Sequence, residues 1–276
     1  MFHILIILST TGILFDIVHC QLPQGFVYLN SIAPDIQVSL RYASNEDFMG
    51  RVVIGYKANV SIMTEQASVG LKYVQEMLRK DNYELVIYDS YRPQKAVDSF
   101  ILWTQNLTDQ VKKKSYYPRL NKQDAVKLGY IAEKSGHTRG STVDLTIIPL
   151  GQKVHIIDVV DRTLTDGYNI SFLNDGTVDM GSSFDLFDIA SHTNSTLVNE
   201  QSRQMRMYLK RIMEQANFTN LPVEWWHYTL INEPFPETYF NFDIQIDNDR
   251  SVANSIFKNN SFLVYLVALV FYSYSK

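Results

Sequence analysis

Two short polar stretches, far apart in the chain, constrain this sequence more than any other feature. Ser135–Asp144 reads SGHTRGSTVD and Glu224–His227 reads EWWH, so each stretch holds one histidine and one carboxylate at close spacing. Two imidazoles and two carboxylates are the ligand set of a catalytic zinc site with one acid to spare. We therefore expect a fold that brings the two stretches together around a metal ion.

The first stretch is expected to run from a loop into a strand. Gly136 and Gly140 bracket His137 and allow the chain to turn there. The β-branched run Val143–Ile148 that follows predicts a strand, and Asp144 would lie on it. His137 and Asp144 can then converge if the glycines turn the chain between them.

The second stretch is less easily reconciled with a shared site. Val223–Ile231 predicts a strand, and regular alternation along it would send Glu224 and His227 to opposite faces. A bulge near Glu224 would be needed to bring both side chains into one cavity. Bulges are common beside active sites, so we expect one here.

The remaining chain alternates short strands with amphipathic helices. We expect strands near residues 36, 84, 143 and 226, and helices near residues 64, 93 and 200. Thr64 is a suitable N-cap, and Pro93 can open a helix at its first turn. Residues 149–195 are loop-rich and are expected to cross over the site.

Composition limits the classes of function. The chain has 276 residues, of which 46% are hydrophobic and 20% are charged, as is ordinary for a globular protein. The net charge is -4, and the basic residues are scattered along the sequence. A nucleic-acid binder would gather them into a patch, so we expect no nucleic-acid partner.

The two ends of the chain predict export from the cell. Residues 1–20 form an interrupted apolar run typical of a signal peptide, with an N-terminal anchor as the alternative. Residues 21–250 would form the folded domain. Residues 251–276 combine a polar spacer with an apolar tail and resemble a GPI-attachment signal, with a terminal strand or buried tail as the alternative. We expect a secreted protein, or a surface-held one attached to the membrane through that tail.

Glycosylation signals agree with this route. Cys20 is the only cysteine, so the mature chain would contain no disulfide. The chain contains several N-x-[ST] sequons, and together they predict a glycoprotein. These sequons begin at Asn59, Asn106, Asn169, Asn194, Asn217 and Asn259.

Four histidines remain after removal of the predicted signal peptide. A lone histidine is more often structural than a ligand, and we interpret His155 and His192 in that way. His137, Asp144 and His227 would fill three zinc positions, and Glu224 would be free to accept a proton from water. The spacing of these residues is not a recognised zinc signature, so the pattern alone leaves the structural alternative open.

A family resemblance sharpens this interpretation. Five motifs, in order, resemble those of the VanX-type zinc D-Ala-D-Ala dipeptidases of peptidase family M15, within the wider group of zinc DD- and LD-carboxypeptidases. The likeness runs from about Leu40 to Leu230. The motifs are Leu40–Ala43 with Phe48 and Gly50, Asp89–Pro93, Ser135–Asp144, Met180–Asp185 and Glu224–His227.

The resemblance implies a role for each site residue. His137, Asp144 and His227 would bind one Zn²⁺ per chain, and Glu224 would be the general base and then the acid. Arg92 would stabilise the oxyanion. Asp185, helped by Tyr42, would hold the free ammonium of a small dipeptide, and Ser135 would help to hold its carboxylate.

The resemblance also implies a fold and two alternative functions. The fold is α+β, with a central antiparallel sheet and helices packed mainly on one side, as in zinc DD-peptidases and Hedgehog domains. One alternative is a DD- or LD-carboxypeptidase that trims longer cell-wall peptides, although an ammonium clamp at Asp185 would penalise them. The other is a non-catalytic zinc-binding module, which would have no need for Glu224.

Overall fold

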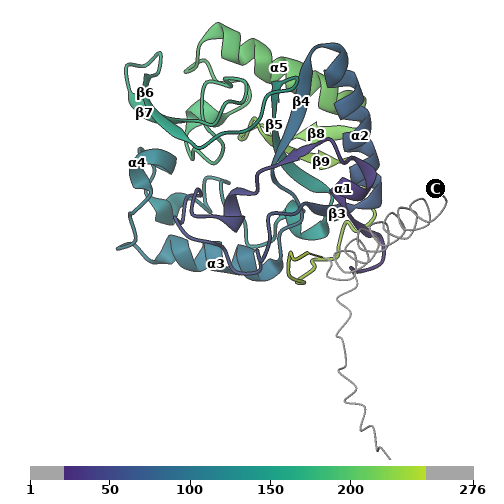
Figure 1. Ribbon diagram of the computed structural model, residues 1–276. Coiled ribbons are helices and arrows are strands. Elements are labelled where there is room, and N and C mark those ends of the chain that lie inside the picture. Colours follow the sequence, from purple (N-terminus) through teal and green to yellow (C-terminus); the bar gives the residue numbers. More distant parts are fainter. Residues whose placement is uncertain (1–21, 247–276) are drawn as a thin grey trace, which may run out of the picture. The chain divides into compact units, whose positions relative to one another are not determined.

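A five-stranded sheet runs through the centre of the computed structural model, which describes residues 22–246 (Figure 1). The strands follow the order β2-β4-β5-β9-β8 across the sheet. Their bounds are Gln37–Val38 for β2, Tyr83–Asp89 for β4, Thr142–Pro149 for β5, His227–Leu230 for β9 and Phe218–Asn220 for β8. The predicted α+β class is confirmed, and three of the four strand pairs are antiparallel, β2 with β4 being parallel.

The two central strands form the core of the sheet. β4 and β5 are buried along almost their whole length, because both read as near-continuous apolar or β-branched runs. Polar residues at their ends are buried as well, including Asp89 and Asp144. Buried carboxylates at strand ends need partners, and these two acids therefore mark the functional end of the sheet.

Two long helices, α2 (Glu65–Lys80) and α5 (Glu200–Gln215), pack on one side of the sheet (Figure 1). Both begin with a side-chain cap: Thr64 Oγ1 accepts a hydrogen bond from Ala67 N, and Asn199 accepts one from Ser202 N. Each helix buries an apolar stripe and exposes a charged face. The helices predicted near residues 64 and 200 are thus confirmed.

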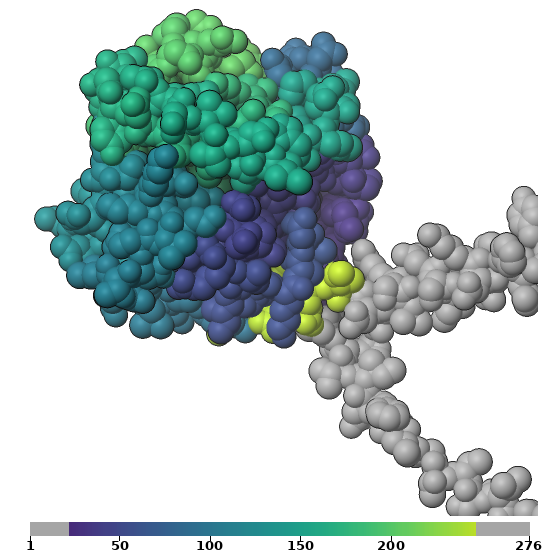
Figure 2. Space-filling view, turned by 60° about the vertical axis from the view of Figure 1, so that its left-hand side comes forward, coloured from purple at the N-terminus to yellow at the C-terminus, as the bar shows by residue number. Residues whose placement is uncertain are grey.

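Shorter elements lie on the other side of the sheet (Figure 1). The helices are α3 (Gln94–Gln105) and α4 (Lys113–Tyr116), and the antiparallel hairpin consists of β6 (Asp158–Thr163) and β7 (Asn169–Asn174). The sequence predicted only a loop over residues 149–195, so this hairpin is an addition. Figure 2 shows that the surface on this side is assembled from segments distant in sequence.

Smaller elements complete the fold. They are β1 (Phe26–Tyr28), α1 (Leu29–Ile32), β3 (Ile62–Thr64) and four short 3₁₀ helices, η1 (Arg41–Ala43), η2 (Lys122–Asp124), η3 (Gly136–Arg139) and η4 (Ile189–Ser191). The strand expected near residue 36 spans only Gln37–Val38, and the chain turns into η1 at Arg41.

Residues Gln24–Ile246 form one compact unit. Within the described residues, no helix combines the length and apolar character that crossing a membrane requires. The predicted signal peptide, the predicted GPI-attachment signal and the Asn259 sequon lie outside the described residues.

Gly140 allows the turn at the start of β5. Its φ is +84°, and a Cβ there would lie 2.2 Å from the ring of Phe26. We expect Gly140→Ala to lower the free energy of unfolding by about 2–4 kcal/mol, through backbone strain and overpacking together. The measurement is urea denaturation of the purified protein.

Gly151→Ala is the matched control for that experiment. Gly151 has a similar φ of +80°, but no atom lies within 4 Å of the added Cβ. Gly151→Ala should therefore lower the free energy of unfolding by about 1–2 kcal/mol, through backbone strain alone. Equal losses for the two variants would mean that contact with Phe26 is unimportant.

Candidate active site

Three acidic or imidazole side chains form a row across the central strands. Asp89 at the end of β4 pairs with Asp144 on β5, and Asp144 pairs in turn with His227 on β9. Residues directly opposite each other on adjacent strands bring their side chains close. The sheet register alone therefore places Asp144 beside His227, although they are distant in sequence.

A tight turn brings His137 to the same place. His137 lies in η3, where Ser135 Oγ accepts a hydrogen bond from His137 N and Gly140 takes the left-handed conformation that ends the turn. Arg92 N donates to His137 O at 3.3 Å, which holds the turn against the chain that leaves β4. The predicted loop-then-strand arrangement of His137 and Asp144 is confirmed.

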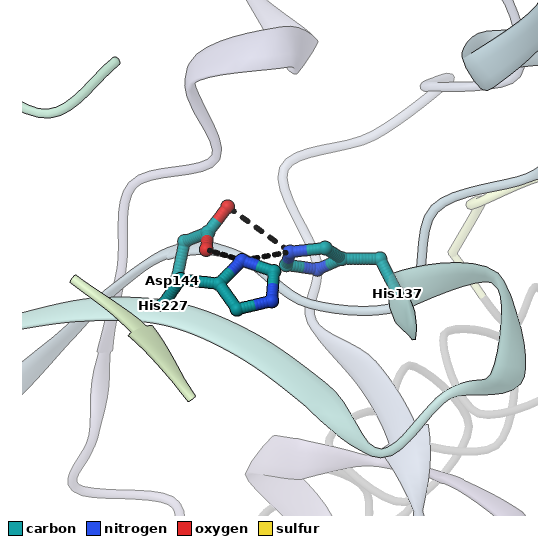
Figure 3. A group of neighbouring side chains, drawn as sticks. All are labelled: His137, Asp144 and His227. Atoms are coloured by element: carbon teal, nitrogen blue, oxygen red, sulfur yellow. Dashed lines mark hydrogen bonds and ion pairs between the residues drawn. The ribbon is translucent and has the colours of Figure 1, made fainter. Parts of the chain in front are cut away.

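Together, His137, Asp144 and His227 can offer ligand atoms that all lie within 4.8 Å of one another (Figure 3). His137 Nε2 is 3.2 Å from Asp144 Oδ2, His227 Nδ1 is 3.0 Å from Asp144 Oδ1, and the two ring nitrogens are 3.3 Å apart. Two nitrogen lone pairs and a carboxylate that face one another need a cation between them. The set suits zinc, which binds imidazole nitrogen and carboxylate oxygen.

The surroundings of this trio also fit a metal. His137 Nδ1 lies 2.7 Å from Ser90 O, and a proton held on Nδ1 by that carbonyl leaves Nε2 free as a ligand. Asp144 Oδ1 is buried and accepts no hydrogen bond of regular geometry from the described residues, although His227 Nδ1 lies 3.0 Å away. A buried carboxylate oxygen left without a donor is costly, and coordination of a cation would satisfy it.

The titration of these groups reflects their crowding. Burial acts to raise the pKa of Asp144, but the neighbouring imidazoles outweigh it and hold that pKa below its ordinary range. Burial acts to lower the pKa of His227, whereas Asp144 and Glu224 raise it to about 9. The two carboxylates thus favour a positive charge at this point of the cavity.

Glu224 reaches the site by a turn and not by the predicted bulge. β9 begins only at His227, so the expected strand over Val223–Trp226 is wrong, and His227 N donates to Glu224 O at 3.3 Å to close a turn. The turn places residues three apart on the same side, and Glu224 Oε2 is 3.4 Å from His227 Nδ1. The two side chains share a cavity, as expected, for a different structural reason.

Arg92 follows β4 and lies over the row of acids. Its Nε donates to Asp89 Oδ2 at 2.8 Å, and its Nη2 lies 3.4 Å from Asp144 Oδ2. The guanidinium also stacks over Tyr42 and Phe100, at 5.0 and 5.2 Å from the ring centres. Aromatic and acidic contacts together fix this cation beside the proposed ligands.

Tyr42 and Asp185 reach the site from η1 and from a loop, respectively. Tyr42 lies in η1, and its hydroxyl donates to Asp185 Oδ2 at 2.7 Å. Asp185 has a φ of +59°, an unusual backbone conformation for a residue other than glycine. Burial and the negative charges of Asp144 and Glu224 raise the pKa of Asp185 well above its ordinary value. A cationic ligand would stabilise the ionised form of this carboxyl group.

A cavity of about 240 Å³ joins these groups. It is smaller than the pockets of about 300–1,000 Å³ that hold drug-sized ligands, so a small ligand fits it best. Ser135 lies in its wall beside Gly136, although its hydroxyl also caps the His137 turn. All predicted site residues except His137 line this cavity: Tyr42, Arg92, Ser135, Asp144, Asp185, Glu224 and His227.

Sequence reasoning missed several residues of this site. Asp89 was noted only as part of the arginine motif, yet it lies 3.6 Å from His137 Nδ1 and binds Arg92. The sequence does hold a signal for Asp89 as a site residue, because this acid ends an apolar strand and lies close to Arg92 in the chain. Phe100 and Tyr130 line the cavity without any such signal, because aromatic residues usually belong to the core. Phe48, which also lines it, was noted only as part of the first family motif.

Comparisons with known proteins agree with this arrangement. The profile of the Peptidase_M15 family, described as D-ala-D-ala dipeptidase, matches residues 23–161 and 166–245. A D-alanyl-D-alanine dipeptidase of Enterococcus faecalis is 34% identical over 220 residues, covering 80% of this chain and 98% of that protein. One from Streptomyces coelicolor is 34% identical over 219 residues, covering 79% and 98%.

A solved structure gives a looser match. It is the vancomycin resistance D,D-pentapeptidase VanY in complex with Zn(II), with a TM-score of 0.34 and 14% sequence identity over 64% of this chain and 77% of that one. This likeness is too loose to carry an argument about the site.

Proposed function

This chain belongs to the Peptidase_M15 family of D-Ala-D-Ala dipeptidases, and on that basis we propose that it is a zinc metallopeptidase that hydrolyses D-alanyl-D-alanine and similar dipeptides. One observation carries the proposal: Asp144, His227, Glu224, Arg92 and Asp185 line a single small cavity. Peptide hydrolysis of this kind needs a metal site, a general base, a cation for the oxyanion and a carboxylate for the substrate ammonium.

His137, Asp144 and His227 would hold the zinc ion. When bound there, zinc supplies a Lewis acid that polarises the peptide carbonyl and lowers the pKa of water toward about 7. Ser90 O orients the ring of His137, and the β5–β9 pairing orients the other two ligands. The protein therefore presents a rigid set of donors from three segments of chain.

Glu224 is the general base. Its carboxylate lines the cavity, and Oε2 lies 3.4 Å from Nδ1 of the proposed zinc ligand His227. It accepts a proton from the attacking water and then donates it to the leaving amine. The turn that ends at His227 fixes the position of both side chains relative to each other.

Arg92 stabilises the negative charge that develops on the carbonyl oxygen. Asp89 and the rings of Tyr42 and Phe100 hold its guanidinium before substrate enters. A cation that is already in place needs no rearrangement during the reaction, which is why such groups are effective. Arg92 Nη2 lies 3.4 Å from Oδ2 of Asp144, one of the proposed zinc ligands.

Asp185 and Tyr42 bind the free ammonium of the substrate, and Ser135 contacts its carboxylate. We expect Asp185→Asn to raise KM for D-Ala-D-Ala about 10- to 100-fold, because a hydrogen bond between charged partners is lost. Steady-state kinetics will measure this. Asp161→Asn is the control, because Asp161 is an exposed residue on the β6–β7 hairpin. An unchanged KM in Asp185→Asn would remove the ammonium clamp from the proposal.

A substrate panel tests the proposed function directly. The zinc-loaded protein should release D-alanine from D-Ala-D-Ala, act poorly on L-Ala-L-Ala, and leave N-acetyl-D-Ala-D-Ala intact because that peptide lacks the ammonium group. Cleavage of the acetylated peptide as fast as the free dipeptide would favour a carboxypeptidase. No release from any of the three would favour a non-catalytic zinc module.

The proposal includes export of the enzyme from the cell. Its support is the sequence of residues 1–20 and 251–276 and the sequons, five of which begin at exposed asparagines within the described residues. Enzymatic removal of N-glycans should reduce the apparent mass of the cell-derived protein. Release from cells by a phosphatidylinositol-specific phospholipase would identify a lipid anchor, and secretion into the medium would exclude one.

A further inference from the structure

Arg206 is a charged residue buried in the core without a charged partner. It lies in the middle of α5, is 0% exposed, and forms no ion pair with any described residue. Burial lowers the pKa of Arg206 to about 9. By contrast, the other deeply buried arginine of the fold, Arg41, is neutralised by Asp175. An unpaired buried charge is costly, so its hydrogen bonds require an explanation.

The guanidinium of Arg206 joins two neighbouring segments. Nε donates to Met180 O at 2.7 Å and Nη2 donates to Ser182 Oγ at 3.0 Å, both in the segment that leads to Asp185. Nη1 donates to His192 O at 2.8 Å, just after η4. The fixed geometry of the guanidinium therefore sets the spacing between these two segments.

Ser182 and Ser191 extend this contact toward Asp185. Ser182 Oγ lies 3.0 Å from Ser191 Oγ, and Ser191 Oγ donates to Leu186 O at 2.7 Å. Leu186 directly follows Asp185 in the chain. The backbone that holds Asp185 in its positive-φ conformation is thus tied, through two hydroxyl groups, to Arg206.

The same serines also hold the Glu224 turn. Trp225 Nε1 donates to Ser182 Oγ at 3.1 Å, and Trp225 N donates to Ser191 O at 3.1 Å. The guanidinium of Arg206 also lies over the indole ring, 5.9 Å from its centre. Trp225 directly follows Glu224. We call Arg206, Ser182, Ser191 and Trp225 the Arg206 cluster.

We propose that Arg206 is a positioning residue that fixes the distance between Asp185 and Glu224 through this cluster. The inference rests on the proposed function, in which Asp185 binds the substrate ammonium and Glu224 is the base. No member of the cluster lines the cavity, so the cluster acts only through its neighbours. A fixed spacing between the two carboxylates would match the enzyme to a substrate as short as a dipeptide.

Arg206→Met tests the proposal, with Arg203→Met as its control. Arg203 lies on the same helix, is partly exposed and forms an ion pair with Glu200. We expect Arg206→Met to lower kcat/KM for D-Ala-D-Ala about 10- to 100-fold in folded, zinc-loaded protein, since small misplacements of catalytic groups have effects of that order. Arg203→Met should behave like wild type. Unchanged kinetics in Arg206→Met would overturn the proposal.

Ser182→Ala provides a second variant in case Arg206→Met fails to fold. The substitution removes the hydroxyl group that bonds Arg206 Nη2, Trp225 Nε1 and Ser191 Oγ. The hydrogen bonds from Arg206 to Met180 O and His192 O remain. We expect a fall in kcat/KM of about tenfold in folded protein, with a lower Tm because Arg206 Nη2 and Trp225 Nε1 lose their acceptor. A loss of Tm with normal kcat and KM would show a merely structural role and contradict the proposal.

A double-mutant cycle separates positioning of the clamp from general damage. If Arg206 acts on KM through Asp185, Arg206→Met should raise KM in the wild type but much less in an Asp185→Asn background. Equal increases in both backgrounds would show that the two residues are independent and would contradict the inference.

Hydrogen exchange keeps this test independent of the proposed substrate. Exchange of the amides of residues 183–188 and 224–227 should be faster in Arg206→Met than in Arg203→Met. If wild type fails to cleave D-Ala-D-Ala but this difference appears, the proposed function fails and the positioning cluster stands. Equal exchange in the two variants would overturn the cluster itself.

Discussion

Glu224→Gln should lower kcat for D-Ala-D-Ala hydrolysis about 10²- to 10⁴-fold, the range expected when a general base is lost. Glutamine keeps the shape of the side chain but cannot accept the proton of the attacking water. The zinc content should stay unchanged, because the ligands His137, Asp144 and His227 are intact. The measurements are steady-state kinetics and metal analysis on the same preparation.

Glu214→Gln is the matched control for this variant. Glu214 lies on α5, is half-exposed and pairs with Lys210, so the same substitution there should leave kcat within error of wild type. If Glu224→Gln retains wild-type kcat with full zinc, another group accepts the proton. If it loses both zinc and activity, Glu224 belongs to the metal site instead.

Asp144→Asn should lower activity by about 10³-fold or more through loss of the metal. Asp144 Oδ2 lies 3.2 Å from His137 Nε2, and Asp144 Oδ1 lies 3.0 Å from His227 Nδ1. Asp144 is also the one carboxylate among the three proposed ligands. An asparagine oxygen has the same reach but a much weaker attraction for a divalent cation. Metal analysis after dialysis should find wild-type protein loaded with zinc and the variant nearly free of it.

Asp35→Asn is the control for the loss of a carboxylate. Asp35 is an exposed residue that pairs with Arg79, and its substitution should change neither zinc content nor activity. Full zinc occupancy and activity in Asp144→Asn would show that the metal binds elsewhere. Loss of secondary structure in that variant would instead make Asp144 a determinant of folding.

The fold was predictable where hydrophobic patterns were long. β4 and β5 are nearly continuous apolar runs, and α2 and α5 show both a cap and an apolar stripe, so each was located from the sequence. The β6–β7 hairpin was missed because β6 is almost wholly exposed, and because burial in neither strand alternates from residue to residue. A hairpin without that alternation leaves little strand signal in a sequence.

The site was predictable in its residues but not in its geometry. Residue types and family motifs identified His137, Asp144 and His227, but only the register of β4, β5 and β9 explains why Asp89 joins them. Regular alternation placed Glu224 on the wrong face, because no sequence signal shows that the strand begins at His227, four residues after the predicted start at Val223.

Long-range polar contacts were the least predictable part. The bonds of Arg206 reach residues 26 and 24 positions away, at Met180 and Ser182, and no local pattern encodes such pairs. A mid-helix arginine is usually solvent-exposed, so its burial could not be foreseen. The hydrogen bond between Tyr42 and Asp185 was equally unpredictable, because the two residues lie 143 positions apart in the chain.

Zinc dependence is tested by a zinc titration of metal-free protein, with bound zinc and D-alanine release from D-Ala-D-Ala measured on the same samples. Activity should rise in proportion to bound zinc and reach its plateau at one ion per chain, and Asp144→Asn should neither bind zinc tightly nor gain activity. Activity that is independent of added zinc, or zinc binding at this site without any D-alanine release, would contradict a zinc dipeptidase.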